Sequence, residues 1–130
     1  MTADMPYVPV SWGELLDKIV ILEIKTERLT SSQARANAAT ELALLGEIAH
    51  PVMASGQAPA LVARLKHLNQ TLWDIEDQIR DHERAGDFGP GFVELARSVY
   101  RHNDQRGALK REINLALGSA LIEEKSYKPY

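Results

Sequence analysis

The sequence predicts an all-α fold: an antiparallel bundle of about four helices in one domain, residues 1–130, with extended arms at both ends. Three observations lead to this prediction. Apolar residues recur at alternating steps of three and four, which is the spacing of one helix face. Capping residues, prolines and glycines bound these segments. No stretch alternates apolar and polar residues over a length that suits a strand.

The composition excludes several classes of protein. A hydrophobic content of 45% and a charged content of 25% are those of an ordinary globular domain. A net charge of −3 gives no basic footprint for nucleic acid. The longest apolar runs fall short of the roughly 18 residues that span a membrane, so no membrane contact is expected. The N-terminal stretch MTADMPYVPV lacks the basic end and apolar run of a signal peptide, which favours a cytoplasmic location.

The first helix is expected to run from Trp12 to about Leu29, after an extended segment that contains Pro6 and Pro9. Ser11 and Glu14 have the spacing of a capping box. In this motif the hydroxyl accepts a backbone N–H and the carboxylate reaches back.

The second helix is expected to start after Thr30, which has Gln33 three residues later, and to end near Ala49 before a His-Pro pair. The third is expected over Pro59 to Arg84, because proline suits the first turn of a helix. Its apolar seam is long enough for a helical hairpin. The seam consists of Leu61, Leu65, Leu68, Leu72, Ile75 and Ile79.

The fourth helix is expected to begin near Pro90 or Gly91 and to end at Leu117, with Gly118 placed to terminate it. Its apolar stripe is interrupted between Val99 and Ile113. Three polar residues occupy these inward turns: Asn103, Arg106 and Lys110. Buried polar side chains need partners, so this interruption indicates a polar site inside the bundle.

Glu23 is the acidic partner that the sequence suggests. At about 100° per residue it falls near the centre of the apolar face of the first helix. A buried carboxylate without a donor costs several kcal/mol or takes up a proton. Five other charged residues of this helix lie opposite and are expected to face solvent: Glu14, Asp17, Lys18, Lys25 and Arg28.

We therefore expect Glu23 to meet Asn103, Arg106 and Lys110 between the first and fourth helices. The preferred interpretation is a site for an anionic small metabolite, which Arg106, Lys110 and Arg97 would bind. Glu23 would then be a catalytic acid–base group, although the sequence does not decide whether a reaction occurs. The alternative is a protein–protein interaction or structural module in which a buried ion-pair network only sets the packing.

The C-terminal stretch EEKSYKPY contains side chains suited to binding. Lys125 and Tyr127 are candidates to contact the same anion, because an ammonium and a phenol both donate hydrogen bonds. This arm is expected to be ordered over the bundle or exchanged with a second subunit. Together with the long apolar seam, it favours a homodimer.

A second alternative is a magnesium-dependent nucleotide pyrophosphohydrolase. Its metal ligands would come from Asp74, Glu76 and Asp77 on the third helix, with Glu14 and Asp17 on the first. The histidines lack the spacing of a zinc site and the chain has no cysteine, so neither a metal centre nor a cofactor is expected.

The chain resembles a family of short bacterial and phage proteins that is known only as a domain of unknown function. The motifs that carry the resemblance cover nearly the whole chain: GELLDKIVILEIK, LWDIEDQIR, ARSVYRHND and EEKSYKPY. The resemblance implies no activity. It does imply an association with surface-polysaccharide and glycosyltransferase genes, which favours a sugar phosphate or a nucleotide sugar as the ligand.

Overall fold

The computed structural model describes residues 4–54 and 56–130, and these residues form four helices and no strand. The helices are α1 (Trp12–Arg28), α2 (Ser32–Met53), α3 (Ala58–Ala85) and α4 (Pro90–Ala116). The predicted all-α helical bundle is confirmed. No helix in the described part of the chain is both long and apolar enough to cross a membrane.

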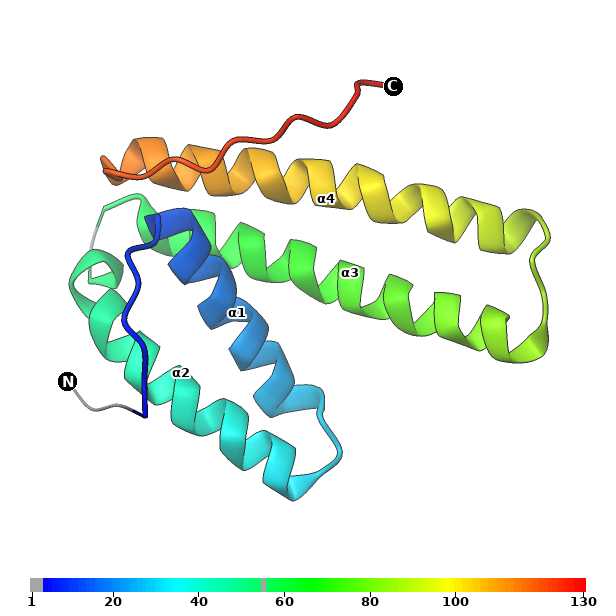
Figure 1. Cartoon of the computed structure of the whole chain (residues 1–130), viewed down its shortest axis with the longest axis horizontal. Coiled ribbons are helices and arrows are strands. Elements are labelled where there is room, and N and C mark those ends of the chain that lie inside the picture. The colour runs from blue at the N-terminus through cyan, green and yellow to red at the C-terminus, as the bar shows by residue number, and fades with distance from the viewer. Residues whose placement is uncertain (1–3, 55) are drawn as a thin grey trace.

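The four helices form two antiparallel hairpins of unequal length (Figure 1). The long hairpin pairs α3 with α4 from end to end. The short hairpin pairs α1 with α2, and α1 packs against both α3 and α4. The C-terminal arm, residues 117–130, turns back and runs along α4 (Figure 1).

The core lies where the two hairpins meet. Leu16 and Val20 of α1, Leu65 of α3 and Ile113 of α4 are at most 1% exposed. Of the predicted seam of α3, Leu61, Leu65, Leu72 and Ile75 are buried, whereas Leu68 and the last seam residue, Ile79, are only half-buried. Burial therefore stops partway along the long hairpin, at the point where α1 and α2 no longer cover it.

Serine side chains cap the N-terminal ends of α1 and α2, and the cap of α2 differs from the predicted one. The Ser11 hydroxyl accepts a hydrogen bond from the Glu14 N–H (3.1 Å), which confirms the predicted start of α1. The cap of α2 is Ser31 and not Thr30, because the Ser31 hydroxyl accepts the Ala34 N–H (3.2 Å).

The expected end of α2 near Ala49 is wrong, because the helix continues through Pro51 to Met53. Pro51 lies in the last turn of the helix. There its missing N–H removes a single hydrogen bond, and no long stretch of helix follows that its ring would have to bend.

Candidate functional site

Glu23 does not occupy the position expected for it. Its side chain is 37% exposed, and the nearest basic group is Lys66 of α3, at 3.9 Å. Arg106 forms its ion pair with a different carboxylate. Glu23 shares a helix face with Leu16, seven residues earlier, but at its level α1 lies against α3 and has moved away from α4. The expectation that Glu23 is buried beside Arg106 is therefore wrong.

Asp17 is the buried acid of the interface, with a side chain only 2% exposed. Its carboxylate accepts hydrogen bonds from Asn69 Nδ2 (2.9 Å) and from Arg106 Nε (3.0 Å). A second guanidinium nitrogen of Arg106 also bonds to it, which makes the contact bidentate. The expectation that Asp17 faces solvent is wrong, because α3 and α4 cover two sides of the first half of α1.

Lys110 of α4 forms the second part of this network, and its side chain is 9% exposed. Its ammonium lies 2.7 Å from the Glu14 carboxylate, 3.1 Å from Glu123 and 3.9 Å from Asp17. Burial lowers the pKa of Lys110, but the hydrogen bonds that its ammonium donates to Glu14 and Glu123, together with the nearby charge of Asp17, outweigh this effect, so the pKa is raised overall. Lys110 is therefore charged at neutral pH. Glu14 reaches Lys110 and not back to Ser11, so only half of the predicted capping box forms.

The start of α1 is docked on α4 by its own backbone. The Gly13 N–H donates to Asn114 Oδ1 (2.6 Å), and the Trp12 N–H donates to Ser119 Oγ (3.2 Å). These groups satisfy N–H donors that have no partner within the helix. The backbones approach so closely that a Cβ added to Gly13 would lie 2.5 Å from the carbonyl oxygen of Lys110.

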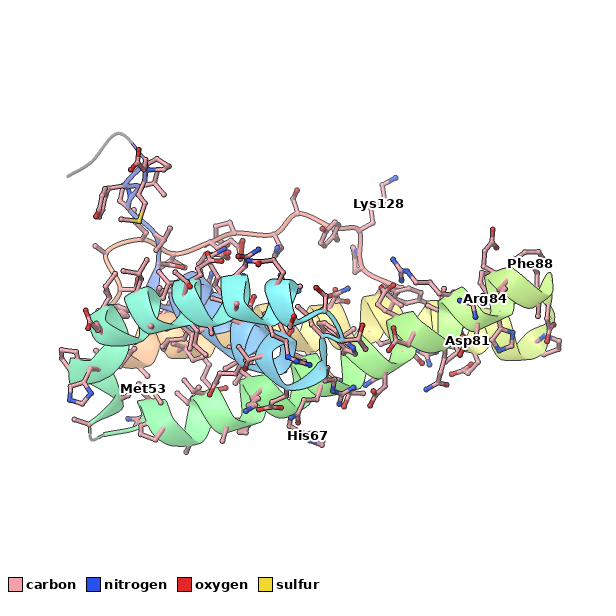
Figure 2. All side chains as sticks on the ribbon, turned by 90° about the horizontal axis from the view of Figure 1, so that it is seen from below. Met53, His67, Asp81, Arg84, Phe88 and Lys128 are labelled. Carbon is pink, nitrogen blue, oxygen red and sulfur yellow. The ribbon has the colours of Figure 1, made fainter. Side chains whose placement is uncertain are left out.

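A cavity of about 1070 Å³ lies between α4 and the C-terminal arm, beside this network. Basic side chains line it: Arg106, Lys110, Arg111, Lys125 and Lys128. Acidic side chains also line it: Asp104, Glu123 and Glu124. Three tyrosines complete the lining: Tyr100, Tyr127 and Tyr130. In Figure 2 the side chain of Lys128 points away from the helices.

Most of the ligand-binding residues expected from the sequence line this cavity. They are Asn103, Arg106, Lys110, Lys125 and Tyr127. Arg97 is not among the lining residues; it lies on the exposed surface of α4, 3.3 Å from Glu94. The cavity lies between α4 and the arm, and not between α1 and α4 as expected. The sequence pointed to the arm as a binding element but did not show that Glu123 and Glu124 would contact α4.

The arm is held on α4 by ion pairs and by one aromatic contact. Glu123 pairs with Lys110 (3.1 Å) and Glu124 pairs with Arg111 (2.9 Å). The rings of Tyr100 and Tyr130 meet edge to face at 4.9 Å. In this state the acidic residues of the arm neutralise two basic groups of the cavity.

The contact between Glu123 and Lys110 should make the arm sensitive to acid. The hydrogen bond from Lys110 holds the pKa of Glu123 below its usual 4.5. Because the pKa of Glu123 is lower in the folded protein than in the unfolded chain, its ionised carboxylate contributes stability above pH 4.5. This stability is lost as the pH falls through the pKa of the folded protein. We expect the amides of the arm to become mobile over this acid range in ¹⁵N NMR relaxation.

A Glu123→Gln variant provides the control, because it removes the titrating group. Its arm should already be more mobile at neutral pH, and its mobility should respond less to acid. An arm that stays rigid in acid, or that is equally rigid in the variant, would contradict this role of Glu123.

The carboxylates considered for a magnesium site do not come together. Asp74 bonds to Arg28, and Glu76 bonds to Arg80 (2.6 Å). Glu14 and Asp17 face α4 instead. Within residues 4–54 and 56–130, no group of three or more acidic, histidine or cysteine side chains is placed to hold a metal ion.

Comparison with known proteins gives one match. Residues 6–130 match a family described as a family of unknown function (DUF6165). No curated protein and no solved structure matches the chain. The resemblance to a family of unknown function is confirmed, while a bacterial or phage origin stays a prediction.

Proposed function

The chain belongs to this family of unknown function, and we propose that the protein binds a small anionic metabolite in the cavity between α4 and the C-terminal arm. The observation that carries this proposal is the charge of the lining: five basic side chains face three acidic ones. Two of the acidic residues, Glu123 and Glu124, belong to the exposed arm.

An anion can take the place of the Glu123 and Glu124 carboxylates beside Lys110 and Arg111, while the rest of the arm still lines the cavity. The arm has no regular secondary structure after Ser119 and is exposed over residues 120–130, so moving it disturbs no buried core. The basic residues of α4 stay in place, because Asp17 holds Arg106 and Glu14 holds Lys110. Pre-positioned basic groups lose little conformational freedom when a ligand binds, which favours affinity.

The cavity suits a phosphate or carboxylate attached to a ring. The Arg111 guanidinium offers planar, bidentate hydrogen bonds to either anion. Tyr127, 78% exposed, adds an aromatic side chain to the lining, where a sugar or base can stack. Sugar phosphates, nucleotide sugars and carboxylates belong to this class. A cytoplasmic location is part of the same proposal.

A thermal-shift screen with pyrophosphate, citrate and a nucleoside diphosphate tests the proposal. At about 100 times its dissociation constant, a bound anion should stabilise the wild type by about 2.7 kcal/mol. The double variant Arg111→Gln/Lys125→Gln should lose this shift. Both residues are about half exposed, so the variant should fold.

The matched control is Lys18→Gln/Arg64→Gln, which removes the same charge outside the cavity. Lys18 and Arg64 form exposed ion pairs with Glu41 and Glu112. This control should keep the full shift. The proposal fails if no probe stabilises the wild type, or if the cavity variant and the control respond alike.

The buried network supports a second candidate, a structural or interaction module. Every charge of Asp17, Arg106 and Lys110 is already paired within the chain. In that case these residues serve only to join α1 to α4. The screen separates the two candidates, because a purely structural network predicts that none of the anions shifts the melting temperature.

A further inference from the structure

The outer half of the long hairpin, residues 76–104, lacks a core of its own; we call it the distal hairpin. The last buried residue of α3 is Ile75, and the first of α4 is Leu109. Figure 1 shows this part extending beyond both α1 and α2. Two paired helices cover only one stripe of each other, and within the described residues the arm reaches only the part of the distal hairpin near Tyr100.

Apolar side chains are present on the part of the distal hairpin that the arm does not reach. Phe88 is 54% exposed and Val93 50%. Val93 lies about two turns before the arm's cover on α4, because Tyr100, seven residues later on the same face, already packs against Tyr130. Between the two helices, Ile79 and Leu95 are only half-buried. Single exposed apolar residues are ordinary, but a series along a helix pair without a core indicates an interface.

The total surface of the chain leads to the same conclusion. A compact monomer of 14.5 kDa is expected to expose about 6,900 Å², whereas this chain exposes 8655 Å². The extended arms and the exposed residues of the distal hairpin both contribute to the difference. A standard protein interface buries about 800 Å² on each partner, so the surplus is large enough to form one.

We propose that the distal hairpin packs against the distal hairpin of a second copy of this chain, forming an intermolecular four-helix bundle. Each copy has the same uncovered surface, and a two-fold axis lets the two surfaces cover each other. Four antiparallel helices enclose a core that two helices cannot. A second copy is therefore the occupant that completes the structure with residues already present.

The charges on the distal hairpin fit this pairing. On α3, Asp77 and Asp81 are exposed and share one helix face, which also carries Arg84. On α4, Arg97 and Arg101 both lie 3.3 Å from a single carboxylate, that of Glu94. When α3 of one copy lies beside α4 of the other, these arginines can meet Asp77 and Asp81. Opposite charges then meet across the interface and favour this orientation.

Sedimentation velocity and light scattering on the full chain test the proposal. The wild type should be a dimer, and Val93→Glu should be a monomer. The substitution places an acid near the N-terminal end of α4, where the helix dipole favours it, so the monomer should fold. Circular dichroism checks the fold, and Phe88→Ser provides a second variant in case Val93→Glu does not fold.

The matched control is Ile48→Glu, which makes the same kind of change on α2, where Ile48 is 55% exposed. It should remain a dimer. A monomeric wild type at all accessible concentrations would overturn the proposal. So would variants of the distal hairpin that fold and stay dimeric, or a control that dissociates while Val93→Glu does not. None of these outcomes depends on a ligand.

Discussion

Replacing Asp17 with alanine is expected to lower the free energy of unfolding by about 3–5 kcal/mol. Among the described residues, Asp17 has the only carboxylate that bonds to Arg106, so its removal leaves a half-buried guanidinium between α1, α3 and α4. The substitution also removes one of the two acceptors of the Asn69 side-chain amide, which still donates to the Leu65 carbonyl oxygen. Breaking one partner of a buried ion pair has a large effect, because the remaining charge is dehydrated without compensation.

Urea denaturation measures this loss, with Glu23→Gln as the control on the same helix. Glu23 makes only a long, exposed ion pair, and such pairs contribute about 0–1 kcal/mol. The variant should therefore unfold almost as the wild type does. Equal effects at positions 17 and 23 would show that the buried network does not hold α1 in place.

A double-mutant cycle measures the interaction energy between Asp17 and Arg106 separately from the other contacts of each residue. Arg106→Met removes the guanidinium and keeps most of the apolar stem. The double variant Asp17→Ala/Arg106→Met therefore removes both charges of the pair, and neither charge is left buried without its partner. We expect it to lose less stability than the sum of the two single variants. Additive losses would mean that the two residues act independently, which the bidentate contact does not predict.

Replacing Gly13 with alanine is expected to destabilise the protein by about 2–3 kcal/mol. The new Cβ would lie 2.5 Å from the Lys110 carbonyl oxygen and 3.0 Å from Asn114 Oδ1. The first contact is with backbone, which cannot rotate away as a side chain can. The start of α1 must therefore move from α4, and the Gly13 hydrogen bond to Asn114 is weakened.

Gly46→Ala is the matched control, and its effect should have the opposite sign. Gly46 lies inside α2, and apart from its chain neighbours and the adjacent backbone of its own helix, no atom of the described residues stands within 4 Å of the position that its Cβ would take. Alanine there should stabilise the helix by about 0.5–1 kcal/mol, because glycine loses more backbone freedom on folding. Thermal denaturation of Gly13→Ala and Gly46→Ala measures the two changes in stability. A neutral or stabilising Gly13→Ala would contradict the close approach of α1 to α4.

The helices were predictable because they depend on residues close together in the chain. The Ser11 cap, the proline at the start of α3 and Gly118 after α4 each act over three or four positions. The cap at Ser31 was missed by one residue and the end of α2 at Met53 by about four, so such predictions place helix ends to within a few residues.

The binding residues were predictable only on one side of the site. The polar interruption of α4 was visible in the sequence, because Asn103, Arg106 and Lys110 stand where apolar residues belong. Their acidic partner was not. A helical wheel gives the direction of a side chain around its own axis, and it places Glu23 in line with the buried Leu16. It does not show where along the helix a neighbour ends.

By itself, the sequence determined the helical class, the helix ends to within a few residues, and the row of polar residues on α4. Only the tertiary structure decided that Asp17 and not Glu23 is buried, that the arm lies over Lys110 and Arg111, and that half of the long hairpin is left uncovered. Helix formation and capping are local, within a turn or two. Burial depends on where helices cross, which is set by packing between residues far apart in the chain.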